Sequence, residues 1–211
     1  MKSKSSLPVF LFFRCLITAV TLAVSASVAQ AADDSESAAI ENPQVLMKTS
    51  LGEIVVELYA DKAPNTVANF IQYVTDEYYN GTVFHRVIDG FMIQGGGFDA
   101  ELNKQATRDP IENEADNGLK NDKFTIAMAR TQDPHSASAQ FFINVADNDF
   151  LNHKAKNLRG WGYAVFGTVV SGQDVVEKIA TVKTGASGPF GKDVPKETIA
   201  IESATLIGQE Q

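Results

Sequence analysis

Short segments in which apolar, aromatic and β-branched residues gather between polar turns are the clearest pattern along the chain. Segments 45–49 and 53–59 flank Ser50-Leu51-Gly52, so a β-hairpin is expected in this region. A Gly/Pro-rich loop is expected to follow residue 180 and to lead into the last strand. The further strands are expected at 124–129, 140–145, 163–170 and 198–207.

The spacing of apolar residues becomes helical in two places. After Pro64, which suits the first turn of a helix, Val67, Phe70, Ile71 and Val74 follow the i, i+3, i+4, i+7 pattern of one buried face. A second helix is expected over residues 173–180. Many strands, two helices and no regular alternation of strands with helices predict a mainly β fold. The expected architecture is a closed antiparallel β-barrel capped by the two helices.

Segment 84–98 predicts two strands around a tight turn, and it contains an unexpected charge. An Asp-Gly pair between apolar runs is a strong turn signal. Alternation in the second strand places Met92 and Gln94 on one face and Phe91 on the other. Arg86 lies inside the first strand, although a guanidinium is rarely buried unless it is paired. Arg86 is therefore a candidate functional residue, with a surface arginine on an edge strand as the alternative.

The first 31 residues have the features of a secretory signal peptide. Lysines precede an apolar run that begins at Leu7, and Ala29-Gln30-Ala31 supplies the small residues of a cleavage site. Cleavage after Ala31 is expected, so that no membrane segment remains. A retained anchor is the alternative, because the apolar run is almost long enough to span a bilayer. The acidic segment 32–43 is expected to be a flexible leader, followed by one domain over 44–208.

Cleavage at this position leaves an acidic protein without cysteine. The full chain has 18 basic and 26 acidic residues, a net charge of −8. Residues 1–31 include Lys2, Lys4 and Arg14 but no acidic residue, so removing these three leaves 15 basic against 26 acidic residues, a net charge of −11. Nucleic acid is not an expected partner, because phosphate binding needs clustered Lys and Arg. The one cysteine, Cys15, lies in the signal peptide, so the mature chain needs no disulfide.

Several kinds of catalytic site are not supported by the sequence. His85, His135 and His153 lack the spacing of metal ligands, so no metal site is expected. The chain has no Gly-x-Ser-x-Gly motif, and the mature chain has no thiol nucleophile. Gly95-Gly96-Gly97 is not followed by the Lys-Ser/Thr of a phosphate loop and is expected to permit close backbone packing. The polar segment 99–122 is expected to be a long surface loop.

Segments 84–98, 124–151 and 163–167 resemble the cyclophilin family of peptidyl-prolyl cis-trans isomerases, in particular its secreted bacterial members. The similarity extends from about residue 45 to 207, nearly the whole mature chain. It implies an eight-stranded barrel closed by two helices, with a substrate groove on the outer face of the barrel. It also implies an isomerase of X-Pro bonds that needs no cofactor and works in the periplasm. A monomer is expected.

The resemblance implies roles for two groups of residues. Arg86, Phe91, Gln94 and Phe142 match the catalytic residues of the family. Substrate contacts are implied for Met92, Ala129, Arg130, Gln140, Phe150, Leu151 and Tyr163. In this interpretation Arg86 donates a hydrogen bond to the prolyl nitrogen as the amide twists, an interaction available only near the transition state.

Two positions depart from the better-known eukaryotic members. Phe150 stands where those have a tryptophan, and Tyr163 stands where they have a histidine, after the additional loop 152–162. Because phenylalanine has no N–H donor, weak binding of the inhibitor cyclosporin is expected. The expected substrates are proline-containing unfolded or nascent exported polypeptides. A chaperone or adaptor that binds such segments without turnover is the alternative, which the presence of Arg86 disfavours.

Overall fold

The computed structural model describes residues 42–208. The predicted signal peptide, its cleavage site after Ala31 and nearly all of the predicted leader lie outside these residues and stay predictions. Within the described range, no helix is both long enough and apolar enough to cross a membrane.

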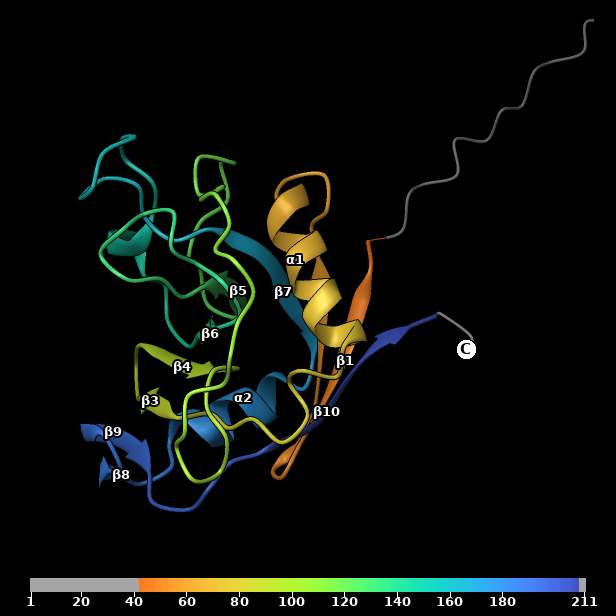
Figure 1. Cartoon of the computed structure of the whole chain (residues 1–211), viewed down its shortest axis with the longest axis vertical. Coiled ribbons are helices and arrows are strands. Elements are labelled where there is room, and N and C mark those ends of the chain that lie inside the picture. Colours follow the sequence, from red (N-terminus) through yellow and green to blue (C-terminus); the bar gives the residue numbers. More distant parts are fainter. Residues whose placement is uncertain (1–41, 209–211) are drawn as a thin grey trace, which may run out of the picture. The chain divides into compact units, whose positions relative to one another are not determined.

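Eight antiparallel strands form one curled sheet (Figure 1). The two hairpins predicted from the sequence are present as β1–β2 and β3–β4. In spatial order the strands are β10 (Ile201–Ile207), β1 (Gln44–Thr49), β2 (Gly52–Leu58), β7 (Val165–Ser171), β5 (Thr125–Met128), β6 (Phe141–Asn144), β4 (Met92–Gly95) and β3 (Arg86–Ile88).

The closed barrel expected from the sequence is found as an open, curled sheet. β3 and β10 are its two edge strands, and they do not pair in a ladder. The chain before β3 meets the chain before β10 through an isolated bridge between Val83 and Ala200. Three backbone hydrogen bonds support this contact: Phe84 N donates to Ile199 O (2.9 Å), Gly81 N donates to Ile201 O (2.8 Å), and Ile201 N donates to Thr82 O (2.7 Å). The ladder does not continue beyond this contact, and β3 lies beside a second, smaller sheet.

This second sheet was not predicted. β8 (Thr184–Ser187) and β9 (Phe190–Pro195) pair in the region expected to be an irregular Gly/Pro-rich loop. The segment lacks alternating apolar residues, its pairing register shifts, and Asp193 has a φ of +66°. The sequence pattern therefore gives no strand signal here. Because β9 lies beside β3 (Figure 1), this hairpin reaches the region of the predicted site.

Both predicted helices are present, and each buries one face. α1 spans Pro64–Thr75, and its predicted core positions are buried except Ile71, which is half-buried. α2 spans Gln173–Ala180, with Val176 and Ile179 buried. A short 3₁₀ helix, η1, spans Asp149–Leu151.

The long loop 99–122 supplies the cap of α1. Ala63, the residue before the helix, has no side chain that could accept a hydrogen bond. Instead, the carboxylate of Glu114 accepts hydrogen bonds from the backbone N–H groups of Asn65 (3.1 Å) and Thr66 (2.8 Å). These are amide groups that an α-helix leaves without partners in its first turn, and a negative charge is favourable there. This part of the loop is therefore structural.

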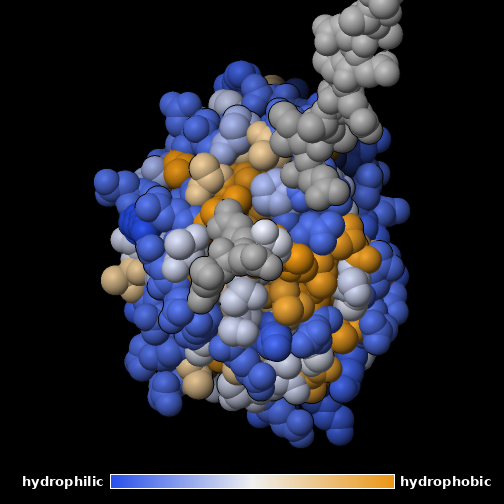
Figure 2. Space-filling model, turned by 90° about the vertical axis from the view of Figure 1, so that its right-hand side faces the viewer, coloured by the Kyte–Doolittle hydropathy of each residue, from blue (hydrophilic) through white to orange (hydrophobic). Residues whose placement is uncertain are grey.

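The main hydrophobic core lies between the sheet and the helices. Phe70 of α1 packs against the rings of Tyr79 (centroids 5.1 Å apart) and Phe141 (5.7 Å), and all three side chains are fully buried. On the face seen in Figure 2, hydrophilic residues predominate and hydrophobic residues gather near the middle. The strand residues of the main core, such as Ile54, Ile93 and Ile126, are fully buried.

Candidate active site

Strand register brings Arg86, Gln94 and Phe142 into one row across three strands. Arg86 of β3 is paired with Gln94 of β4, and Gln94 is paired with Phe142 of β6. Directly paired residues point to the same face of a sheet. Their neighbours Val87 and Ile93 are buried in the main core. The row therefore lies on the opposite, outer face of the sheet.

A second hydrophobic cluster covers this outer face. Its buried members are Met92, Ala127, Phe142, Leu151 and Val165. Phe91 packs against the cluster, although strict alternation places Phe91 and Met92 on opposite faces. The reason is that β4 begins at Met92, so Phe91 belongs to the preceding turn, where alternation does not apply.

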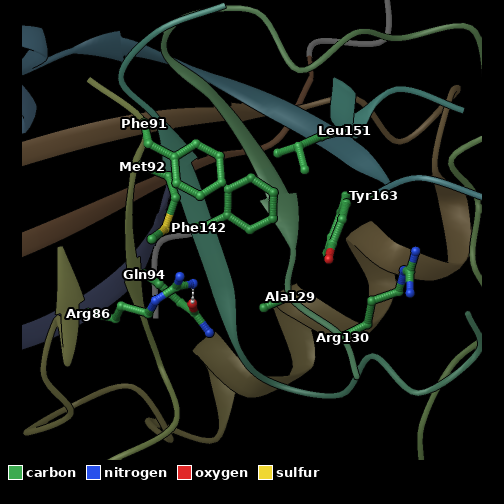
Figure 3. A pocket seen from close by; sticks show the side chains of 9 residues that line it. All are labelled: Arg86, Phe91, Met92, Gln94, Ala129, Arg130, Phe142, Leu151 and Tyr163. Carbon is green, nitrogen blue, oxygen red and sulfur yellow. Dashed lines mark hydrogen bonds between the residues drawn. The ribbon is translucent and has the colours of Figure 1, made fainter. Parts of the chain in front are cut away.

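This cluster forms the wall of a pocket of about 190 Å³ (Figure 3). The pocket is smaller than the ~300–1,000 Å³ of most small-molecule sites, so it suits one small ring rather than a cofactor. In Figure 3, Arg86 and Gln94 lie at one side of the pocket, while Arg130 and Tyr163 lie at the other. The lining residues are Arg86, Phe91, Met92, Gln94, Ala129, Arg130, Phe142, Leu151 and Tyr163, all of them predicted from the sequence.

A chain of polar contacts runs along one side of the pocket. Arg86 Nη1 donates to Gln94 Oε1 (3.4 Å), and Gln94 Nε2 donates to Gln140 Oε1 (3.0 Å). Gln140, for which a substrate contact was predicted, does not line the pocket, and its Oε1 orients Gln94. A Cβ on Gly97 would collide with the Gln140 side chain, so glycine at this position makes room for the chain of contacts. Gly95 and Gly96 likewise leave room for the rings of Phe84, Tyr79 and Phe141, so the run makes space for side chains rather than for a neighbouring backbone.

Asp193 of β9 is a functional candidate that the sequence did not reveal. Its Oδ2 lies 3.8 Å from Arg86 Nε, and the Asp193 side chain is only 20% exposed. The carboxylate partly compensates the charge of Arg86 and restrains its guanidinium beside the pocket. Lys192 Nζ lies 3.9 Å from the same carboxylate oxygen. Because Asp193 is remote in sequence and lies in the unpredicted hairpin, no local signal relates it to Arg86.

Asparagine side chains hold the apolar wall in place. Asn148 Nδ2 donates to the backbone carbonyl of Phe91 (2.9 Å) and to Asn144 Oδ1 (2.7 Å). Asn144 Nδ2 donates to Asn121 Oδ1 (3.3 Å), and the backbone N–H of Asn121 donates to Asn152 Oδ1 (2.7 Å). This network ties the turn before β4 to the loop after η1. No sequence pattern predicted this network, since asparagine is common in turns.

Tyr163 and Arg130 form the far side of the pocket. The Tyr163 ring packs edge-on against Phe142, with centroids 5.6 Å apart. The guanidinium carbon of Arg130 lies 4.5 Å from the centre of the Tyr163 ring, a cation–π contact. Arg130 Nε donates to Gly162 O (2.9 Å), and Nη1 donates to Thr131 O (2.9 Å). The position of Arg130 is thus fixed by both neighbouring segments.

Phe150 lies at the rim rather than in the pocket. Its side chain is 65% exposed, and its ring centroid is 5.5 Å from that of Phe91. Such an exposed ring extends the apolar wall outward, where a longer ligand would cross it.

The polar side chains that line the pocket can form hydrogen bonds beside an apolar wall. Among residues 42–208, no group of three or more His, Cys, Asp or Glu side chains could hold a metal ion. His135 and His153 both pack against Trp161, and their ring centroids lie 5.0 and 5.3 Å, respectively, from that of Trp161. A guanidinium and a carboxamide beside a pocket for one small ring are suited to binding a peptide and polarising one of its amides.

Comparison with known proteins identifies the family. Residues 44–206 match the model of the family described as "Cyclophilin type peptidyl-prolyl cis-trans isomerase/CLD". The chain belongs to the cyclophilins. It is 59% identical over 162 residues to peptidyl-prolyl cis-trans isomerase B of Escherichia coli (strain K12), covering 77% of this chain and 98% of that protein. It is also 59% identical over 164 residues to peptidyl-prolyl cis-trans isomerase cyp18 of Streptomyces antibioticus, covering 78% and 98%.

Solved cyclophilin structures have the same fold. A cyclophilin-type isomerase of Cryptosporidium parvum superposes with a TM-score of 0.63 at 24% identity, covering 80% of this chain and 99% of that one. Cyclophilin AquaCyp293 from Hirschia baltica gives a TM-score of 0.64 at 22% identity, covering 80% and 75%. The family match and the relatives at 59% identity show that this cyclophilin is an enzyme, a peptidyl-prolyl cis-trans isomerase.

Proposed function

We propose that this cyclophilin rotates X-Pro bonds in unfolded, newly exported polypeptides, with the proline ring in the pocket and Arg86 as the catalytic residue. One observation carries the proposal. The Arg86 guanidinium lies at the edge of an apolar pocket of about 190 Å³ and is held there by Gln94 and Asp193. A proline ring in this pocket would bring its amide nitrogen next to the only arginine that belongs to the β3–β4–β6 row.

The proposed mechanism follows from the electronic structure of the amide. Rotation costs about 18–20 kcal/mol because the C–N bond has partial double-bond character. In the twisted state the nitrogen regains a lone pair, to which Arg86 donates a hydrogen bond that the planar amide does not accept. The planar amide is also the more dipolar form, so the apolar wall of Phe91, Met92 and Phe142 favours the twisted one. Gln94 is placed to hold the substrate carbonyl while the prolyl ring stays fixed.

The magnitudes are compatible with this small set of groups. Uncatalysed X-Pro exchange takes on the order of 10–100 s. A rate of about 10³ s⁻¹ requires roughly five decades, or about 7 kcal/mol of barrier lowering. A hydrogen bond from a charged donor contributes about 1.5–3 kcal/mol. The remainder is assigned to orientation of the peptide and removal of water from the amide.

Substitution of Arg86 tests the catalytic role. Arg86→Ala should lower kcat/KM for a short proline peptide, measured by exchange NMR, by at least tenfold with the fold intact by circular dichroism. Arg86→Lys keeps the charge but loses the planar guanidinium, so its kcat/KM should lie between those of the wild type and of Arg86→Ala. Near-normal activity in a folded Arg86→Ala protein would contradict the mechanism.

The proposed site of action is the periplasm. It is supported by the charged start, the apolar run and the small residues Ala29-Gln30-Ala31 in the sequence. Intact-mass analysis of the protein purified from its native host should find a chain that begins at Ala32. A product that retains residues 1–31 would favour a membrane anchor instead.

A holding chaperone is a second candidate function, favoured by the exposed ring of Phe150 beside Phe91. The Arg86→Ala protein separates the two functions. If holding matters, this variant should still suppress aggregation of a client whose refolding is not limited by proline. If only isomerisation matters, the wild type will not suppress that aggregation either.

A further inference from the structure

A wide groove continues from the proline pocket across the surface. Its volume is about 1400 Å³, which is room for several residues of an extended peptide. Arg86, Arg130 and Tyr163 line both the pocket and the groove. A peptide whose proline occupies the pocket therefore extends into the groove. The other lining residues are Thr131, Gln132, Asp133, Leu158 and Arg159.

The groove is more positive than the protein around it. Three arginines and one aspartate line it, in a chain whose net charge is −8. Within residues 42–208, neither Arg130 nor Arg159 forms an ion pair. The aspartate is Asp133. Its Oδ1 accepts a hydrogen bond from the backbone N–H of His135 (2.9 Å), which stabilises the turn to which Asp133 belongs. Two arginines in the groove thus have no carboxylate partner in the described part of the chain.

Arg159 is presented by a well-tied loop. Lys154 N donates to Gly160 O (2.7 Å), which closes the loop on itself. Lys156 Nζ forms an ion pair with Asp116 (2.6 Å), which fixes the loop to the segment before β5. The Trp161 ring is packed between two histidines. A preorganised loop loses less conformational entropy when a ligand binds than a flexible loop does, so Arg159 can contribute more to binding.

Arg130 lies close to the proline pocket, because it lines both the pocket and the groove. The Arg130 guanidinium carbon is 4.5 Å from the centre of the Tyr163 ring, which itself lines the proline pocket. Successive Cα atoms of a peptide are about 3.8 Å apart. Arg130 therefore lies within reach of a residue next to the proline, and Arg159 lines the groove into which the following residues of the peptide extend.

We propose that this groove recognises a carboxylate one or two residues from the isomerised proline, with Arg159 as a specificity-determining residue beside Arg130. The preferred substrates are then X-Pro segments that carry Asp or Glu next to the proline. The inference rests on the proposed function, in which proline occupies the pocket.

Matched peptides test this selectivity. Peptides with Glu or Gln placed before or after the X-Pro pair are compared by exchange NMR at low salt. On one side of the proline, kcat/KM should be about fivefold higher for Glu than for Gln, as expected for an exposed ion pair. The ratio should fall toward one in 0.5 M salt, because exposed charges are screened. Arg159→Gln should also bring it close to one. Lys154→Gln, which removes a positive charge from the same loop outside the groove, should leave it unchanged.

The outcomes separate the inference from the proposed function. Equal turnover of Glu and Gln peptides on both sides, or a ratio that Arg159→Gln does not change, overturns the selectivity while leaving the isomerase intact. Failure to turn over any of the peptides contradicts the proposed function itself.

Discussion

Acid should destabilise this domain through His85, which is buried beside Arg86. Its side chain is 2% exposed, its ring packs against Phe98 (4.6 Å) and Phe190 (5.6 Å), and Nδ1 has no hydrogen-bond partner within residues 42–208. Burial lowers the pKa of His85 to about 4. An interaction with the Val83 backbone opposes this shift, and the charge of Arg86 adds to it. Lys196 lines the small cavity at His85, and no acidic residue of the described chain does.

The direction of the effect follows from the two pKa values. Above about pH 6.5, His85 is neutral in both the folded and the unfolded chain, and the free energy of unfolding does not depend on it. Between about pH 6.5 and 4 the unfolded chain binds a proton that the folded domain does not bind, so the domain loses stability as the pH falls. The loss is about 2 kcal/mol at pH 5 and about 3 kcal/mol at pH 4. That is a large share of the ~5–15 kcal/mol of a typical domain.

Urea unfolding at a series of pH values, followed by the fluorescence of Trp161, measures this loss. His85→Phe is the matched variant, because it keeps a ring between Phe98 and Phe190 but does not titrate. From pH 7 to 4, the wild type should lose about 3 kcal/mol more than the variant, since the carboxylates titrate in both proteins. An NMR titration should give a pKa near 4 for His85. A pKa near 6.5, or the same pH dependence in both proteins, would refute the reasoning.

Two further predictions concern Phe150 and Glu114. Phe150→Trp restores an indole donor at the rim and should tighten cyclosporin binding by roughly ten- to a hundredfold in a direct titration, with little change for short proline peptides. Equal affinity of both proteins would show that Phe150 does not contact the inhibitor. Glu114→Gln should lower the free energy of unfolding in urea by about 1–2 kcal/mol, because α1 loses its charged cap. The same change at the exposed Glu112 of this loop is the control, and an equal loss there would contradict the capping role.

The sequence by itself determined the order of most elements and much of the pocket. Periodicity predicted α2 with its observed bounds, and it predicted the start of α1 at Pro64. These predictions succeed because helix and strand formation depend on the spacing of apolar residues that are close in the chain. The resemblance of the motif segments to the cyclophilins predicted the site residues. It named all nine residues that line the pocket, including Arg86 and Tyr163.

The tertiary structure decided how these residues are supported and which others join them. Asp193 reaches Arg86 from a hairpin without a strand pattern, and Glu114 caps a helix that starts some fifty residues earlier. The openness of the sheet also depends on where β3 packs, since β9 rather than β10 lies beside it. Arg159 lines the groove from a loop that is joined to the segment before β5 by the ion pair between Lys156 and Asp116. Each of these contacts joins residues far apart in the chain, and their meeting depends on register and packing that no local pattern encodes.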